Sequence, residues 1–566
     1  MARSKKKPST PQSPKDSTPV VYSSKKQLGQ QQQHLRSTSI FKKSPVYDLL
    51  HYFEKAPDQW TARYILILTA IILRAAVGLG SHSGYHTPPM FGDFEAQRHW
   101  MELTINLPIS QWYFFDLQYW GLDYPVLTAY HSFICGKLGN FINSSWFALN
   151  TSRGLETDDI RTFMRITAII SELIIYIPSI LKIANILGKK SNINRMDQII
   201  IALIIINQPH LILIDHGHFQ YNSIMLGFFI YSIIDLIKGN LIMASVWFIS
   251  CINFKQMGLY YSLFIFFYIL SQLNSLSKFF LVGVTVLLTQ FIYLLPFIWF
   301  HPDSILQIVY RVFPFNRGLF EDKVANFWCT TNILIKYREI LTDASQLSKL
   351  ALIATLLTTI PINLLIFYKI KTATNNTKKA NTEVTPSSSS SSSSSSLPLN
   401  IVAMIYGFAL NALSFYLFSY QVHEKSILIA LIPISLLLLI NPQQDITMIQ
   451  FINTVGTFSL YPLLKKDGLI MQYFVLNFLI NWLIGFDLII VNPNPQKNSK
   501  SSSKLLNINN LIIWIIYFMM IIYHIIDFTI DPPLKYPDLW VILNTTISFV
   551  AFSYFWLWLV YRIIKL

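Results

Sequence analysis

The stretch FFLVGVTVLLTQFIYLLPFIWF, residues 279–300, decides the fold class because it contains no charged residue. A bilayer core about 30 Å thick needs roughly 20 apolar residues for one helical span. Unpaired backbone groups are not tolerated in hydrocarbon, so a run of this kind is expected to be a helix. Apolar runs of similar kind predict about 14 transmembrane helices, at residues 63–80, 162–187, 197–214, 221–238, 240–255, 258–273, 278–300, 349–370, 399–420, 426–441, 448–464, 469–492, 508–530 and 540–563. The sequence therefore predicts an all-α polytopic membrane protein.

The composition of the whole chain agrees with this prediction. Of the 566 residues, 52% are hydrophobic and only 13% are charged, whereas soluble domains carry about 25% charged residues. The net charge of +15 would suggest nucleic acid in a soluble protein, but here the basic residues lie mostly between the apolar runs. That placement is typical of cytosolic loops facing anionic lipid, so we expect membrane lipid and no nucleic acid as a partner. Three scattered cysteines are too few for a disulfide framework or a cysteine metal site.

Lysine and arginine also predict how the chain is threaded. Residues 1–62 form a polar, basic tail without a cleavable signal peptide, which we expect to be cytosolic and largely disordered. The rest divides into a membrane domain at 63–370 with non-cytosolic loops 81–161 and 301–347, a serine-rich cytosolic linker at 371–398, and a C-terminal membrane domain at 399–566. Both termini are then cytosolic.

This threading requires that the apolar stretch 124–142 does not cross the bilayer. If it crossed, Lys189, Lys190 and the serine-rich linker would lie on the non-cytosolic side, against the lysine bias. We therefore expect 124–142 to be a helix at the membrane interface. A glycan on Asn143 or Asn150, each the first residue of an Asn-X-Ser sequence, would support this expectation.

The first polar cluster on the non-cytosolic side is GDFEAQRHWME, residues 92–102. Asp93 follows a membrane span directly, and a carboxylate at the boundary between water and lipid is well placed to act as a general base. At helical spacing, Trp100 and Leu103 can face the bilayer. Asp93, Gln97 and Glu102 then face a cavity. The alternative is that Asp93 caps a solvated amphipathic helix.

Two further clusters have more than one interpretation. Residues 119–125, YWGLDYP, place Asp123 among aromatic side chains that can form an interface belt or a platform for sugar rings. Residues 215–222, DHGHFQYN, contain an Asp-x-x-His pattern that suggests metal ligands. One short loop gives a poor tetrahedral set, so polar packing between two helix ends is the better interpretation.

Cations concentrate on the same predicted side of the membrane. The loop 311–328 and the segment QVHEK at 421–425 contribute most of them, together with one histidine, His423. A phosphate at the lipid boundary needs cations of this kind, and arginine binds phosphate in a bidentate way. Ordinary pairing with nearby acids is the alternative, although charges at membrane depth are costly and seldom without function. The candidate cations are Lys255, Arg311, Arg317, Lys323 and Lys425.

Taken together, these motifs resemble those of the dolichyl-phosphate-glucose-dependent glucosyltransferases of the endoplasmic reticulum, which have the GT-C architecture. The resemblance extends from about residue 60 to the last span. It departs from the family pattern at Val126, where a second proline is expected, and at the serine insertion 387–396. The motifs that carry it are residues 92–100, 120–125, 213–222, 317–323 and 421–426.

The resemblance implies an inverting transfer of glucose from dolichyl phosphate glucose to a dolichyl-pyrophosphate-linked oligosaccharide, forming an α-1,3 bond without a metal or other cofactor. Asp93 would be the catalytic base, on the lumenal side. His423, with Arg317 or Lys425, would hold the donor phosphate, which is a good leaving group when cations stabilise it. Asp123 and Glu321 would orient the sugars or the cations, and Asp215, His216 and His218 would shape the site rather than react. Arg98 and His218 are also expected at the substrates.

Within the family, residues 123–132 and 151–154 most resemble the subgroup that adds the first glucose to the Man9GlcNAc2 glycan. The subgroup that adds the second glucose is the nearest alternative. A lipid or sugar transporter is an alternative of another class, because charges within the membrane also mark transport paths. The chain shows no internal repeat, however, and its polar clusters lie on one side only. A non-catalytic subunit of a glycosylation complex is a further alternative.

Overall fold

The computed structural model describes residues 39–53, 60–313, 318–320, 322–341, 343–383, 397–490 and 500–566, and these residues contain helices and no strands. Among these described residues, seven helices are long and apolar enough to cross a membrane, and three shorter helices are also apolar. The predicted all-α polytopic fold is thus confirmed, whereas the number of spans stays a prediction. The serine run and the N-terminal tail up to residue 38 lie outside the described residues.

Helices occupy the predicted apolar runs, but the run 162–187 contains two helices, and the helix that begins at Ala344 continues to Glu383, into the predicted linker. In the first half they are α2 (Pro45–Leu50), α3 (Trp60–Gly78), α4 (Gly92–Asn106), α5 (Val126–Ile142), α6 (Asp158–Ile174), α7 (Tyr176–Lys190), α8 (Arg195–Ile206), α9 (Pro209–Ile212), the π-helix η4 (Leu213–Phe219), α10 (Asn222–Ile237), α11 (Leu241–Phe254), α12 (Ser262–Gln272), α13 (Leu276–Phe300) and α14 (Ser304–Val312). In the second half they are α15 (Phe327–Thr331), α16 (Tyr337–Ile340), α17 (Ala344–Glu383), α18 (Leu399–Phe418), η6 (Glu424–Ser426), α19 (Ile427–Leu436), α20 (Pro442–Ser459), α21 (Tyr461–Lys466), α22 (Ile470–Ile484), α23 (Phe486–Ile490), α24 (Lys500–Thr529) and α25 (Leu539–Lys565).

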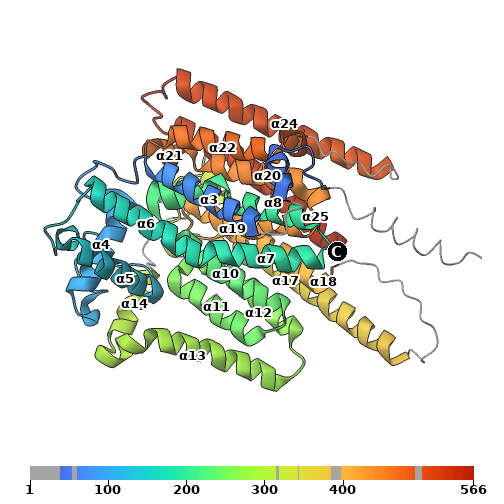
Figure 1. Cartoon of the computed structure of the whole chain (residues 1–566), viewed down its shortest axis with the longest axis horizontal. Helices are drawn as coiled ribbons and strands as arrows, with labels where there is room; N and C mark the ends of the chain where they lie inside the picture. The colour runs from blue at the N-terminus through green and yellow to red at the C-terminus, as the bar shows by residue number, and fades with distance from the viewer. Residues whose placement is uncertain are drawn as a thin grey trace, which may run out of the picture.

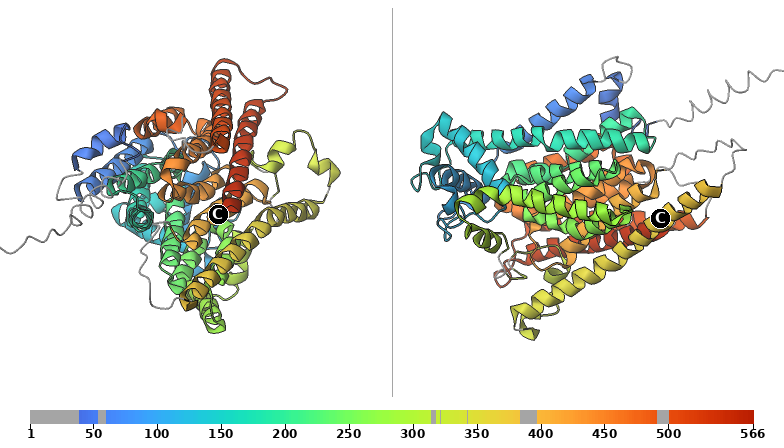
Figure 2. Two further views of the ribbon diagram at one scale, coloured as in Figure 1. Left: turned by 90° about the vertical axis from the view of Figure 1, so that its right-hand side faces the viewer. Right: turned by 90° about the horizontal axis from the view of Figure 1, so that it is seen from below.

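Most of the long helices run along the longest axis of the molecule, so that the bundle has two ends (Figure 1). Helices α4, α5 and α14 lie at one end, and the C-terminus lies at the other. The view from below in Figure 2 shows the same separation. Segments far apart in sequence therefore meet at each end of the bundle.

Hydrogen bonds identify the segments that share the end with the C-terminus. Lys369 Nζ donates to the carbonyl of Ile564 at 2.9 Å, and Lys371 Nζ donates to the carbonyl of Leu273 at 3.1 Å. The segments around these residues carry several of the lysines that the threading places in the cytosol. The domain boundaries and the side of the membrane stay predictions.

A small apolar core holds α4 at the opposite end. Trp100 and Leu103 on α4 are 3% and 0% exposed and pack with residues of α5, α13 and α14. The expectation that Trp100 and Leu103 face the bilayer is therefore wrong. The segment after α13 folds back over α4. Trp100 and Leu103 therefore contact protein side chains, not lipid.

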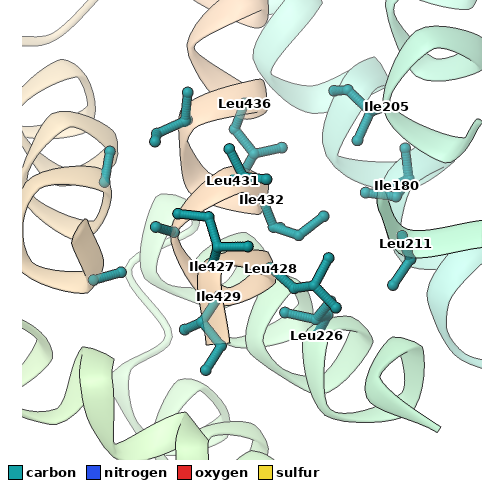
Figure 3. Packing of buried hydrophobic residues seen from close by; sticks show 14 of the residues in the cluster. Ile180, Ile205, Leu211, Leu226, Ile427, Leu428, Ile429, Leu431, Ile432 and Leu436 are labelled. Atoms are coloured by element: carbon teal, nitrogen blue, oxygen red, sulfur yellow. The ribbon is translucent and has the colours of Figure 1, made fainter. Parts of the chain in front are cut away.

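A second core lies beneath the polar end of the bundle. Figure 3 shows side chains of α19, such as Ile427 and Leu431, among side chains of neighbouring helices, including Ile180 and Leu226. Every residue of α19 is buried. Because α19 begins immediately after η6, this packing fixes the position of the turn that carries Lys425.

Candidate active site

The start of α4 places Asp93 in the site through an unusual backbone turn. Phe91 and Gly92 both have positive φ, of 57° and 67°. A Cβ on Gly92 would lie 2.7 Å from Ser83 Oγ, so only glycine fits there. The backbone N–H of Asp93 donates to the same Ser83 Oγ at 3.2 Å. Phe91 is the N-cap residue of α4, and the interpretation of Asp93 as a capping residue is therefore wrong.

The side chain of Asp93 accepts three hydrogen bonds on one oxygen. Oδ2 accepts from Gln220 Nε2 at 2.6 Å, from His218 Nε2 at 2.9 Å and from Lys425 Nζ. Within the described residues Oδ1 accepts no hydrogen bond, and the side chain is 25% exposed. One carboxylate oxygen is thus anchored, and the other is available to a ligand.

The same neighbours set the charge state of Asp93. Burial alone would raise the pKa of Asp93, but Lys425 and then His218 more than offset this effect and hold that pKa well below its usual range. Burial likewise opposes the charge on Lys425, whereas Asp93 raises the pKa of Lys425 above its ordinary value. The two side chains therefore form an ion pair at neutral pH.

His218 reaches Asp93 because the helix ahead of it widens. Residues 213–219 form a π-helix that ends at Phe219, whose φ is +88°. The carbonyl of His218 accepts from the Ser83 N–H at 3.0 Å, which ties this turn to the segment before α4. His218 Nδ1 lies 2.5 Å from Asp467 Oδ2. The ring is therefore held between two aspartates.

Gln220 connects Asp93 to a second cation, Lys255. The Gln220 side-chain oxygen accepts from Lys255 Nζ at 3.2 Å, and Lys255 also donates to Asn222 Oδ1 at 2.7 Å. Lys255 Nζ lies 4.8 Å from the centre of the Tyr124 ring. The half-buried Asp123 precedes Tyr124 and acts electrostatically on Lys255. The predicted residues Asp123 and Asp93 thus belong to one polar cluster.

The turn η6 presents His423 and Lys425 to neighbouring parts of the site. Its geometry is fixed by the Ser426 Oγ, which accepts from the His423 N–H at 3.3 Å. His423 pairs with Asp322 and lines a cavity of about 240 Å³ together with Tyr260, Phe313 and other mainly apolar side chains. Lys425 reaches Asp93 instead. One short turn therefore carries both His423, the predicted phosphate ligand, and Lys425, which contacts the predicted base Asp93.

Comparison with known proteins identifies the family of the chain. Residues 69–558 match the ALG6, ALG8 glycosyltransferase family. The chain belongs to this family. The glycosyltransferase activity and the polytopic GT-C membrane fold implied by the motifs are thereby confirmed.

Curated relatives match this glycosyltransferase over most of its length. The dolichyl pyrophosphate Man9GlcNAc2 alpha-1,3-glucosyltransferase of Saccharomyces cerevisiae is 44% identical, over 92% of this chain and 95% of the relative. A protein of Schizosaccharomyces pombe named as a probable enzyme of the same kind is 41% identical, over 92% and 96%. The Gallus gallus protein with the same name as the first is 36% identical, over 88% and 96%.

The other predicted site residues of the glycosyltransferase occupy different places. Arg311 donates to the carbonyls of Gly121 and Leu122 at 2.8 and 3.2 Å and so joins α14 to the segment before α5. Lys323 forms a half-exposed pair with Asp538. Arg317 and Glu321 lie outside the described residues. Their expected roles stay predictions.

In the segment 215–222, polar side chains pack between two helix ends, which is the interpretation that the sequence favours. Asp215 accepts from Asn222 Nδ2 at 2.8 Å and from the Ser223 N–H at 2.7 Å, at the start of α10. His216 Nε2 lies 2.6 Å from Glu172 Oε2. Among the residues that the structure describes, no group of three histidine, cysteine or acidic side chains is placed to hold a metal ion.

Arg98 is buried and holds α4 in place through hydrogen bonds and ion pairs. It donates to both oxygens of Glu95 at 2.6 Å, to Glu102 at 2.6 Å and to Ser152 Oγ at 2.7 Å. Its side chain is fully buried. These contacts tie α4 to the segment around residue 152, and the role of Arg98 as a substrate ligand stays a prediction.

Replacing Arg98 by methionine is expected to destabilise the protein strongly, because Glu95 and Glu102 would remain buried without their cation. Removing one partner of a buried ion pair costs about 3–5 kcal/mol. Thermal unfolding in detergent measures the effect. Arg153→Met is the control, because the Arg153–Asp116 pair is partly exposed and such pairs contribute only about 0–1 kcal/mol. Equal unfolding temperatures of the two variants would show that the buried ion pairs of Arg98 do not stabilise the fold.

The sequence motifs did not assign a role to Gln220 or Asp467. Gln220 lies within the quoted segment 213–222, two residues after His218, and this proximity was the available signal. Asp467 lies in the connection between α21 and α22, outside every quoted motif. Only the folded chain places it beside His218.

Proposed function

We propose that this glycosyltransferase transfers the first glucose from dolichyl phosphate glucose to the Man9GlcNAc2 oligosaccharide on dolichyl pyrophosphate. The bond formed is α-1,3, and the reaction belongs to the assembly of the N-glycan precursor. Asp93 carries this proposal, since its side chain is partly exposed and one of its two oxygens is anchored by Lys425, His218 and Gln220. The names of the curated relatives support the acceptor and the linkage.

The transfer is a single displacement with inversion at the anomeric carbon. Asp93 Oδ1 takes the proton of the acceptor hydroxyl, whose oxygen forms a bond to C1 of glucose. The bond between C1 and the phosphate oxygen breaks on the opposite face, and its electron pair leaves with dolichyl phosphate. Inversion to an α product requires a β-linked donor. No metal takes part in this scheme.

Cations at the site stabilise the departing phosphate. Lys425 is close enough to Asp93 to serve both the base and a phosphate beside it, and charge-assisted hydrogen bonds to an oxyanion are among the stronger polar contacts. His423 lines the adjacent cavity, where it pairs with Asp322. Arg317 completes the proposed phosphate ligands. The apolar residues of the same cavity suit the first units of the lipid.

We place the site on the lumenal side of the endoplasmic reticulum membrane, with both termini in the cytosol. The segments that carry Asp93, Lys255, Lys323 and Lys425 meet at one end of the bundle, and the segments of Lys369 and Lys371 lie at the other. The lysine-rich segments then face the cytosol. Labelling of single cysteines introduced into 81–161 and into 188–196 tests this: reagent added outside sealed microsomes should reach only the second.

The purified full-length protein tests the reaction. Incubation with dolichyl phosphate glucose and the Man9GlcNAc2 lipid is expected to give one added glucose in α-1,3 linkage, identified by mass spectrometry and glucosidase digestion. The glycan that already carries one glucose is the control acceptor. Transfer to this glycan would instead indicate the enzyme that adds the second glucose. EDTA is expected to leave the rate unchanged. Inhibition by EDTA that a divalent ion reverses would overturn the metal-free scheme.

A further inference from the structure

The His218 ring lies between two carboxylates that come from distant parts of the chain. Nε2 is 2.9 Å from Asp93 Oδ2, and Nδ1 is 2.5 Å from Asp467 Oδ2. The side chains of His218 and Asp467 are each 3% exposed. An ionised carboxylate only accepts hydrogen bonds, so both contacts are made when each ring nitrogen carries a proton. The arrangement thus favours the imidazolium.

Asp467 is held in this position by the connection between α21 and α22. Its carbonyl accepts from the Ser81 hydroxyl, and Gly468 follows with a φ of +74°, which favours glycine. Ser81 belongs to the segment that leads into α4. The backbone of Asp467 is therefore fixed against the same segment that places Asp93.

We propose that Asp467 is a positioning residue for the glucosyl transfer, which holds the His218 ring charged and oriented so that Nε2 donates to Asp93 Oδ2. This inference rests on the proposed function. Asp467 does not touch the substrates in this scheme and acts only through His218. It keeps one oxygen of Asp93 anchored, so that the free oxygen faces the acceptor.

The other polar groups around the ring explain why the carboxylate matters. Lys425 Nζ lies 3.1 Å from His218 Nε2, and Arg165 donates to the carbonyls of residues 216 and 217. Burial and then the charge of Lys425 oppose a positive charge on His218. Without the charge of Asp467, the ring gives up its Nε2 proton more readily. Nε2 then accepts from Lys425 and no longer donates to Asp93.

The test is the pH dependence of the turnover number of Asp467→Asn in the full-length protein. We expect kcat at neutral pH to fall about 10- to 100-fold, as is typical when a residue that orients a functional group is lost. The KM values for both lipid substrates should stay unchanged. The alkaline limb of the kcat profile should move to lower pH by about one unit, because an opposite charge no longer stabilises the imidazolium.

Three comparisons separate this role from general loosening of the fold. Asp467→Glu and Asp467→Gln are matched in size, and only the glutamine protein should show the lowered alkaline limb. Asp527→Asn removes a carboxylate that pairs with Lys465 in the neighbouring α21, and it should leave the limb in place. In a His218→Gln background, adding Asp467→Asn should have no further effect on kcat, because the group through which Asp467 acts is absent.

An unmoved alkaline limb in both Asp467→Asn and Asp467→Gln would overturn the inference. So would a full effect of Asp467→Asn in the His218→Gln background. If the asparagine protein does not fold, the glutamate and glutamine pair decides alone. Inactive wild-type protein would overturn the proposed function instead, so the two failures are distinguishable.

Discussion

Asp93→Asn is expected to lower kcat about 10²- to 10⁴-fold, which is the usual contribution of a general base. The amide cannot take the proton of the acceptor hydroxyl, although it keeps the size of the carboxylate and can still accept from Gln220. The KM for dolichyl phosphate glucose should change little. Single-turnover assays with both lipid substrates measure the effect without interference from product release.

The control for this prediction is Asp158→Asn. Asp158 lies on the same predicted side of the membrane, at the start of α6, and its side chain is 96% exposed. This variant should keep the wild-type rate. Both proteins should elute as folded protein with similar unfolding temperatures. If Asp93→Asn turns over within tenfold of the wild type, another group accepts the proton and the proposed mechanism is wrong.

Lys425→Gln is expected to have the second largest effect on kcat. In the proposed mechanism Lys425 both pairs with Asp93 and binds the departing phosphate. Loss of a donor to a developing oxyanion typically lowers kcat about 10²- to 10³-fold. The same change removes the main group that lowers the pKa of Asp93, so that pKa should rise. A carboxylate that protonates at higher pH loses its basic form sooner on acidification. The acid limb of kcat/KM should therefore move to higher pH.

Lys323→Gln is the matched control for Lys425→Gln. Lys323 lies at the same end of the bundle, but it forms a half-exposed pair with Asp538. We expect the rate and the acid limb of this variant to resemble those of the wild type. An acid limb that does not move in Lys425→Gln would show that the lysine does not control the charge of Asp93.

The helical membrane fold could be predicted from the sequence because its signal is local. An uncharged run such as residues 279–300 needs no information from the rest of the chain. The placement of Trp100 could not be predicted, because the partners that bury it come from α5, α13 and α14. The N-cap interpretation of Asp93 failed for a related reason. The turn at Phe91 and Gly92 is fixed by contact with Ser83, which periodicity does not reveal.

The candidate site was predicted only where its residues lie in distinctive motifs. Asp93, His423 and Lys425 were named, and the structure brings Asp93 and Lys425 into contact across 332 positions of the chain. Asp467 was not named, because an aspartate after a pair of lysines is ordinary in a loop. Its importance comes from a neighbour 249 positions earlier.

The distance in sequence between Asp93 and its partners affects the order of events during synthesis. Chains emerge from the ribosome from the N-terminus onward, so the base is made first. The lysine that pairs with it and the aspartate behind His218 follow more than 300 residues later. A nascent or truncated chain that ends before residue 425 thus contains the reactive carboxylate with His218 and Gln220, but it lacks Lys425 and Asp467. Catalytic competence arises only once the C-terminal membrane helices have been inserted.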